Sequence, residues 1–318
     1  MKKLMVLALA MLMVLSMVAC GGEEKKGDGT YKVGICQLAP HDALDAATEG
    51  FKKALTDAFG DKVTFIEENA AGEPANCTTI INSLISSKVD LIMANATPAL
   101  QVAANATRTI PVLGTSVTEY GVALGLDNFS GTVGTNVSGT SDLADLEQQA
   151  NMIVEWFPEA KNVGLLYCSA EANSLYQVNK VSEYLTAQGI TCQMFAFTDT
   201  SDMNQVTTDA AAWSDVIYVP TDNVVANATD VVANVCRTAK VPVIAGEEGI
   251  CKGCGVATLS ISYYDLGYTT GQMAVKILKG EAKPQDMAIE YAPTTKKYNA
   301  EMCEFLGITP VEGYEKIG

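Results

Sequence analysis

Two groups of polar residues have the types and the spacing to bind a small molecule that carries both charges. Thr97, Ser116 and Thr118 follow short apolar runs in the first half of the sequence. There, hydroxyls and the N–H groups of a following helix suit an anion. Asp222 and Glu247 follow equivalent runs in the second half, and their carboxylates suit a cation. An α-amino acid is the simplest ligand that satisfies both groups.

Further polar residues are candidates for the rim of the same site. They follow apolar runs or begin helix-like stretches, so each can also be explained as part of a loop or as a helix cap. Thr97 and Asp222 share this alternative. These further candidates are Gln37, His41, Ser169, Asn173, Asn223 and Asp265.

The composition excludes several kinds of chemistry. The 318 residues include one histidine, so a His-rich metal site and catalysis by paired histidines are impossible. Glu247 and Glu248 are adjacent on a segment expected to be extended, where they point in opposite directions and share no acid–base chemistry. A net charge of −16 argues against nucleic acid as a partner, because Lys and Arg must neutralise phosphates. We therefore expect no catalytic residue, no metal and no cofactor.

Short apolar runs alternate with helix-like stretches, and these elements must position the polar residues. The runs are continuously apolar, which is typical of parallel strands covered on both faces by helices, the α/β class. In such sheets, ligands bind beyond the carboxyl ends of the strands. The predicted strands are 32–36, 63–67, 90–94, 112–114, 133–137, 163–167, 191–196, 216–219, 243–245 and 257–261. The predicted helices are 44–59, 76–86, 98–107, 141–156, 174–188, 203–213, 223–237 and 264–278.

The two halves of the sequence repeat one order of elements. Segments 90–114 and 215–245 each run from a strand through a helix to a second strand, and residues 31–35 match residues 161–165. An ordered repeat of this kind predicts two similar lobes. The residues that carry hydroxyls and the residues that carry carboxylates would then face each other across a cleft, with Thr97 opposite Asp222.

The first residues predict export and anchoring. Two lysines precede an uncharged run, 4–18, that is too short for a membrane span of about 20 residues. This pattern predicts a signal peptide at 1–19. Ala19-Cys20-Gly21 resembles the lipobox of bacterial lipoproteins, which implies a lipid on Cys20. Residues 20–30 are then a lipidated flexible stalk. We expect an extracytoplasmic protein that contacts the bacterial cell membrane only through this lipid.

Ordered motifs span nearly all of the remaining chain. They are Gln37 with His41-x-Ala43-Leu44-Asp45-Ala46, Val89-Asp90-Leu91-Ile92 with Ala96-Thr97-Pro98-Ala99, Val117-Thr118, Ser141-Asp142, Ser169-x-Glu171-Ala172-Asn173-Ser174, Tyr218-x-Pro220-Thr221-Asp222-Asn223, Ala245-Gly246-Glu247-Glu248-Gly249 and Tyr263-Tyr264-Asp265-Leu266-Gly267. With them, the chain from about Lys32 to Ile308 resembles the substrate-binding lipoproteins of bacterial ABC importers, specifically the tryptophan/tyrosine-binding (TrpX-like) family.

The resemblance implies a type I periplasmic-binding-protein fold. Two similar lobes, each with a parallel sheet flanked by helices, would be joined by three crossovers and would close on the ligand by hinge motion. By analogy, the first lobe comprises 31–158 plus 261–285, and the second comprises 159–260 plus 286–318.

The function that we expect is capture of a small zwitterion, an amino acid that is aromatic or otherwise, for delivery to ABC permease subunits by a monomer. The sequence departs from the family at Pro40 and Asp42 and at Glu119-Tyr120, which leaves the ligand's identity open. Two alternatives remain. The chain could be a ligand sensor for a membrane kinase or chemoreceptor, or it could bind another solute such as a nucleoside.

Cysteines are unusually frequent, at nine in the chain. With Cys20 set aside, an even number remains, which invites disulfides outside the cell. The alternatives for one local bridge are Cys251–Cys254 and Cys236–Cys251. The cysteines in predicted strands are equally well explained as core residues.

Overall fold

The structure is a computed structural model that describes residues 29–318. The chain divides into two compact units, Met1–Thr30 and Tyr31–Gly318, and the fold below is that of the second unit. The predicted signal peptide and the lipid site at Cys20 lie outside the described residues, as does most of the predicted stalk.

The first sheet has the strand order β11-β5-β4-β3-β1-β2, and all its pairings are parallel. The sheet is covered on both faces, because alternate side chains of one strand enter different cores. Leu91 and Met93 pack with Phe51 and Met273, whereas Ile92 packs on the opposite face with Leu100. The strands are β1 (Tyr31–Gln37), β2 (Val63–Asn69), β3 (Leu91–Asn95), β4 (Val112–Val117), β5 (Val137–Ser141) and β11 (Glu290–Tyr291).

The second sheet has the order β13-β12-β10-β9-β8-β6-β7. Its strands β10-β9-β8-β6-β7 pair in parallel, in the same order as β5-β4-β3-β1-β2 of the first sheet. Strand β12 then pairs with β10 in the antiparallel direction. The strands are β6 (Asn162–Cys168), β7 (Thr191–Phe197), β8 (Val216–Val219), β9 (Val243–Ala245), β10 (Ala257–Ser260), β12 (Thr295–Tyr298) and β13 (Glu315–Lys316). This matching order bears out the repeat predicted from the sequence.

Helices flank each sheet, and a sheet with its helices is called a lobe below. The first lobe contains α2 (Asp42–Phe59), the short η1 (Gly60–Lys62), α3 (Pro74–Ser86), α4 (Thr97–Ala106), α5 (Tyr120–Leu124), α12 (Tyr263–Leu278) and η2 (Pro284–Asp286). The second contains α6 (Leu146–Trp156), α7 (Ala172–Ala187), α8 (Thr200–Trp213), α9 (Asn223–Ala226), α10 (Thr229–Ala239), α11 (Glu248–Cys254) and α13 (Ala300–Leu306). None of the helices in the described part of the chain has the length and apolar character of a membrane span.

The repeat extends to individual hydrogen bonds. A carboxylate oxygen of Asp90, just before β3, accepts a hydrogen bond of 2.9 Å from the backbone N–H of Lys32. Asp215, just before β8, accepts bonds of 2.9 Å from the backbone N–H groups of Lys161 and Asn162. The same residue type therefore ties together the same two neighbouring strands in each lobe.

Three segments carry the chain between the lobes. They are residues 142–145 between β5 and α6, 261–262 between β10 and α12, and 292–294 between β11 and β12. The first differs from the expected lobe limit at 158, because Ile153 and Trp156 of α6 pack in a core of the second lobe. The third differs from the expected limit at 285, because β11 pairs with β5 of the first sheet.

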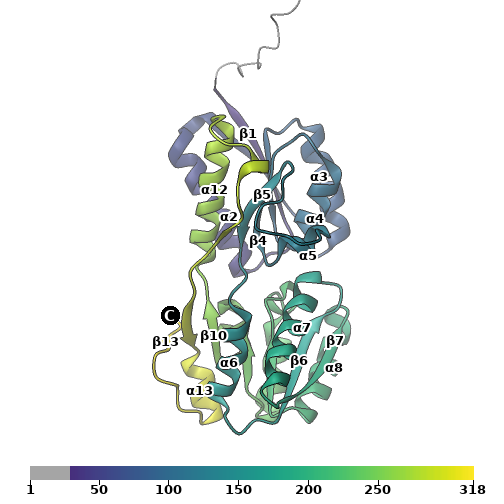
Figure 1. Ribbon diagram of the computed structural model, residues 1–318, viewed down its shortest axis with the longest axis vertical. Helices are drawn as coiled ribbons and strands as arrows, with labels where there is room; N and C mark the ends of the chain where they lie inside the picture. The colour runs from purple at the N-terminus through teal and green to yellow at the C-terminus, as the bar shows by residue number, and fades with distance from the viewer. Residues whose placement is uncertain (1–28) are drawn as a thin grey trace, which may run out of the picture. The chain divides into compact units, whose positions relative to one another are not determined.

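Helices α2 and α12 pack closely against each other in the first lobe (Figure 1). Two glycines make this possible. A Cβ atom on Gly50 would collide with the backbone carbonyl of Tyr264, and one on Gly267 would collide with the backbone carbonyl of Ala47. The helix that follows the second crossover is thereby fixed to the helix that follows β1.

The eight cysteines of the described residues are all free, and seven of them are buried. Neither of the disulfides considered from the sequence is present. Cys251 and Cys254 lie in the short helix α11, and the Cys254 thiol donates to the carbonyl of Ile250. They serve as core residues of the second lobe.

Candidate functional site

The polar residues predicted for the site lie at the carboxyl ends of strands in both sheets. His41 follows β1 of the first lobe and Asn223 follows β8 of the second. His41 Nε2 and Asn223 Oδ1 lie 3.4 Å apart, so the two loops meet across the lobe boundary. Burial lowers the pKa of His41, which keeps the imidazole neutral near pH 7.

The three candidate residues that carry hydroxyls lie on the first lobe, as their positions in the sequence predicted. Thr97 begins α4, and Ser116 and Thr118 lie at the end of β4 and just beyond it; all three are buried. Two residues here have positive φ although neither is glycine: Ala96 at 91° and Ser116 at 53°. Such backbone conformations persist only where the surroundings enforce them, and they cluster at functional sites.

Asp222 and Glu247 are buried helix caps in the second lobe. Asp222 Oδ1 accepts hydrogen bonds from the backbone N–H groups of Val224 and Val225, and Oδ2 accepts one of 2.7 Å from Cys168. Glu247 accepts bonds from the N–H groups of Gly249 (2.7 Å) and Ile250 (2.5 Å). The capping alternative noted from the sequence therefore holds for Asp222, and Glu247 caps α11 in the same way. Every carboxylate oxygen of the pair already accepts a hydrogen bond.

A polar network in the second lobe surrounds Glu171, which was not among the predicted site residues. Glu171 Oε2 accepts hydrogen bonds from Asn173 Nδ2 (2.9 Å) and from the Nδ2 (2.8 Å) and backbone N–H (3.2 Å) of Asn223. Since Asn223 also reaches His41, this network extends to the first lobe. Asn173 Oδ1 is buried without a hydrogen-bond partner among the described residues.

Asp142 is a second acid that was not among the predicted site residues. It lies in the first crossover with 4% of its surface exposed. Its Oδ2 accepts a 3.1 Å hydrogen bond from the hydroxyl of Tyr263, at the start of α12. Its Oδ1 is buried and has no partner in the described part of the chain. Its place directly after Ser141, within a motif of the family, was the signal available in the sequence.

These four acids carry raised pKa values because burial disfavours their charged forms. The pKa of Asp142 rises to about 6, and those of Glu171 and Glu247 rise to about 7; that of Asp222 is also raised. None of them takes part in an ion pair found among residues 29–318. The lobe boundary therefore holds several buried carboxyls and no basic side chain paired with them, which favours a cationic ligand.

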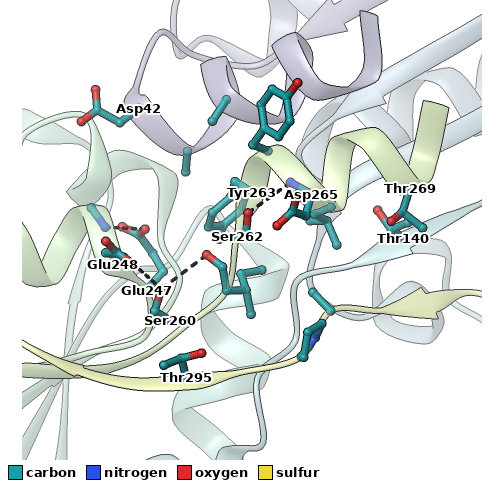
Figure 2. A pocket seen from close by; sticks show the side chains of 18 of the residues that line it. Asp42, Thr140, Glu247, Glu248, Ser260, Ser262, Tyr263, Asp265, Thr269 and Thr295 are labelled. Atoms are coloured by element: carbon teal, nitrogen blue, oxygen red, sulfur yellow. Dashed lines mark hydrogen bonds between the residues drawn. The ribbon is translucent and has the colours of Figure 1, made fainter. Parts of the chain in front are cut away.

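A cavity of about 650 Å³ lies beside the second and third crossovers. Figure 2 shows Glu247 and Glu248 on one side of it, Tyr263 and Asp265 on another, and Thr295 below. Lys297 forms a 2.8 Å ion pair with Glu248, which also accepts a hydrogen bond from Ser260. The volume is that of a small-molecule site. Both lobes contribute to its lining, and Glu247 belongs both to the cavity and to the capped strand end.

Three predicted residues either form hydrogen bonds within one lobe or lie at the start of a helix. Gln37 bonds to Asp45 (2.6 Å) and Thr48 (2.6 Å) within the first lobe. Ser169 is exposed, and its hydroxyl donates to the carbonyl of Phe197. Asp265 is exposed at the start of α12 and lines the cavity. Gln37 and Ser169 thus lie at strand ends like the other candidates, but their hydrogen bonds stay within their own lobes.

The departures from the family have local structural roles. Glu119 caps α5 through the N–H groups of Gly121 and Val122. Tyr120 is buried, and its hydroxyl donates a 3.1 Å bond to the carbonyl of Thr140. Asp42 is the first residue of α2 and lines the cavity.

Two similar α/β lobes, parallel sheets and three crossovers define a type I periplasmic-binding-protein fold, as expected. The chain belongs to the ABC transporter substrate binding protein family, whose model matches residues 32–313. This family is extracytoplasmic and its members are solute-binding proteins, not enzymes.

Individual relatives agree with this assignment. The "Tyrosine-binding protein" of Clostridioides difficile (strain R20291) is 34% identical over 295 residues, which cover 88% of this chain and 85% of that protein. A crystal structure described as the ABC domain in complex with L-Trp from Streptococcus pneumonia is 31% identical, with a TM-score of 0.86, and covers 91% of this chain and all of the other. A ligand-free, open substrate binding protein with adhesive properties from Clostridium difficile is 36% identical with a TM-score of 0.69, over 91% and 99% of the two chains.

Proposed function

We propose that this chain is the solute-binding lipoprotein of an ABC importer and that it captures an amino acid, with tyrosine and tryptophan as the first candidates, between its lobes. The ligand's carboxylate would bind the hydroxyls of Thr97, Ser116 and Thr118 and nearby backbone N–H groups. Its ammonium would lie among the buried carboxyls. The protein would act as a monomer, without a cofactor.

The observation that carries this proposal is a set of buried polar atoms at strand ends of both lobes, none of which has a hydrogen-bond partner within residues 29–318. They are Ser116 Oγ and Asp142 Oδ1 on the first-lobe side and Asn173 Oδ1 in the second lobe. Leaving such an atom unsatisfied costs about 1–3 kcal/mol. A ligand that hydrogen-bonds to both lobes removes this cost only when the lobes are closed around it, which is the basis of ligand-driven closure.

The relatives support the choice of amino acid. One curated relative is a tyrosine-binding protein and one solved relative holds L-Trp. The TM-score is higher against the L-Trp complex than against the open, ligand-free protein, although sequence identity is lower. This order is expected if the lobes of this chain are arranged as in a ligand-bound protein.

Thermal-shift screening against the twenty amino acids, nucleosides and sugars tests the ligand class. A ligand at 100 times its dissociation constant adds about 2.7 kcal/mol of stability. We expect an aromatic amino acid to raise the melting temperature. A shift with nucleosides or neutral sugars alone would overturn the amino-acid proposal.

Anchoring and transport need separate tests. Two or three acyl chains on Cys20 would hold the protein at the membrane durably. We expect wild-type protein in the membrane fraction of cells and a Cys20→Ala variant in the soluble fraction. Loss of uptake of the identified ligand in a strain without the protein would support the importer role, whereas unchanged uptake would favour the sensor alternative.

A further inference from the structure

We infer that Asp142 is the residue that binds the ammonium group of the solute, which makes it the residue that selects amino acids over their des-amino analogues. This inference rests on the proposed function and deepens it. It assigns the ammonium site to the first crossover and not to Asp222 and Glu247, the two acids expected from the sequence.

Asp142 has a buried carboxylate oxygen that is free to accept a hydrogen bond, unlike Asp222 and Glu247, the two acids expected from the sequence. Its Oδ2 is held by the Tyr263 hydroxyl at 3.1 Å, and its Oδ1 is buried without a hydrogen-bond partner among residues 29–318. The side chain of Thr118 also favours the charged carboxylate, which partly offsets the effect of burial on its pKa. Both oxygens of Asp222 and both of Glu247 already accept backbone N–H groups. An ammonium group has three N–H donors, and Asp142 Oδ1 can accept one without breaking an existing bond.

The neighbouring strand supplies a hydroxyl for the carboxylate end of the same ligand. Val117 of β4 is the register partner of Ser141 of β5, so Ser116 and Asp142 lie at adjacent strand ends. The backbone N–H of Asp142 donates a 3.2 Å bond to the carbonyl of Val117, which fixes this arrangement. Ser116 Oγ is also buried and without a partner in the described chain. One amino acid could then use both unpartnered oxygens, with its ammonium group donating to Asp142 and its carboxylate accepting from the Ser116 hydroxyl.

Charge at this position supports the same assignment. A buried carboxylate without a cation is costly, and none of the ion pairs in the described chain includes Asp142. Burial raises its pKa to about 6, so at pH 7 most of the protein carries the charge. The titratable groups around it are Tyr120, Tyr263 and Glu247, of which Glu247 alone titrates in the same range, near 7. A bound ammonium would offset the cost of this charge.

The position of Asp142 couples recognition to lobe closure. The residue lies in one crossover and bonds to Tyr263, which directly follows another. A cation bound to Asp142 therefore contacts the hinge itself. Buried carboxylates paired with a cation are much more favourable than isolated ones, so binding stabilises the hinge conformation in which Asp142 is buried.

The test is calorimetric titration with L-tryptophan and with its des-amino analogue, indole-3-propionate, for wild-type protein and Asp142→Asn. We expect the substitution to weaken L-tryptophan binding at least 10-fold and to leave binding of indole-3-propionate unchanged or tighter. Asp61→Asn, at an exposed acid of η1, is the matched control and should change neither. L-tyrosine with its des-amino analogue replaces this pair if screening favours tyrosine.

The pH profile gives a readout that a merely structural role would not move. Wild-type affinity for the amino acid should fall as the pH decreases from 8 to 5, and the decrease should be absent in Asp142→Asn. Tyr263→Phe removes a donor that lowers the pKa of Asp142, so it should move the decrease to higher pH. Glu247→Gln should not change the pH at which affinity decreases, which distinguishes the titration of Asp142 from that of Glu247.

The outcomes are distinguishable. Equal losses for L-tryptophan and indole-3-propionate in Asp142→Asn, or no loss for either, would overturn the ammonium site and leave the proposed function intact. If Asp142→Asn fails to fold, an unchanged profile in Tyr263→Phe would overturn it. If folded wild-type protein binds no amino acid at all, the proposed function itself fails.

Discussion

Asp222 illustrates how one carboxylate can fit two interpretations that do not exclude each other. Sequence position allowed it to be a ligand contact, a helix cap or both; the N–H groups of Val224 and Val225 establish the cap, and contact with the ligand stays a prediction. His41 shows the opposite case. Its sequence position suggested either a ligand contact or an element that closes the cleft, and the 3.4 Å approach to Asn223 supports a role at the lobe boundary.

Replacing Asp222 by alanine should destabilise the protein strongly. The change removes a cap, which costs about 0.5–2 kcal/mol, and it leaves the buried N–H of Cys168 without its acceptor, which costs about 1–3 kcal/mol more. Chemical denaturation measures the loss. Asp199→Ala, at the exposed cap of α8, removes a cap alone and should cost less. Equal losses in the two variants would contradict the additional role of Asp222.

Replacing His41 by alanine should weaken ligand binding without lowering stability. The hydrogen bond to Asn223 exists only when the loops of the two lobes meet, and its net value is about 0.5–1.5 kcal/mol, or about 2- to 12-fold in affinity. Calorimetry with the identified ligand measures the change. His41→Gln keeps a donor and should recover part of the affinity. An unchanged affinity in His41→Ala would show that the contact does not contribute to closure.

The candidate site could be predicted from the sequence only in part. Positions after apolar strands identified Thr97, Ser116 and Asn173, because parallel strands deliver their carboxyl ends to one edge. Asp142 and Glu171 were missed, although both lie in motifs of the family. These two acids differ from Asp222 and Glu247 in which of their carboxylate oxygens accept backbone hydrogen bonds. This difference depends on backbone geometry, which residue order does not reveal.

At the scale of elements, strands and helices were predicted well where apolar runs were long and bounded by turns. The differences are local. The predicted helix 223–237 is two helices, α9 and α10, because the chain leaves helical geometry at Ala228. The strand predicted at 133–137 overlaps the observed strand only at its last residue, since β5 spans Val137–Ser141. Its polar residues Ser138, Thr140 and Ser141 are buried by hydrogen bonds that the apolar pattern could not indicate.

The contact between α2 and α12 yields a prediction for Gly267→Ala. Alanine should gain about 1 kcal/mol of helix propensity, yet its Cβ meets the backbone of Ala47, and overpacking costs about 1–3 kcal/mol when neighbours can move. Because backbone cannot move aside as a side chain can, we expect net destabilisation in thermal or urea unfolding. Gln272→Ala, at an exposed position of the same helix, should be neutral or stabilising. A stabilised Gly267→Ala would show that the helices can separate.

At the scale of the whole molecule, the repeat in the sequence predicted the architecture of two similar lobes. Matching strand orders and the matching roles of Asp90 and Asp215 follow from it. The lobe limits were harder to predict. The first crossover falls before α6 because the apolar face of that helix completes a core of the second lobe, and residue order alone does not say which core a helix joins.

The ligand-free protein should be more stable at pH 5 than at pH 8. The buried acids have folded pKa values of about 6 to 7, above the values near 4 of unfolded carboxyls. Groups with raised folded pKa values contribute stability that is complete below about pH 4 and is lost as the pH rises through 7. Urea denaturation across this range measures the effect. Net charge acts in the same direction, so Glu247→Gln is the control and should reduce the slope; an identical slope would contradict the assignment.

The meeting of His41 and Asn223 has a practical consequence for observing the protein at work. His41 is the only histidine in the chain, so its imidazole gives the only histidine ring signals in a nuclear magnetic resonance spectrum. Burial at the lobe boundary lowers its pKa, and separation of the loops would return the ring to water and towards ordinary titration. One natural side chain, without any label, thus reports whether the molecule is open or shut.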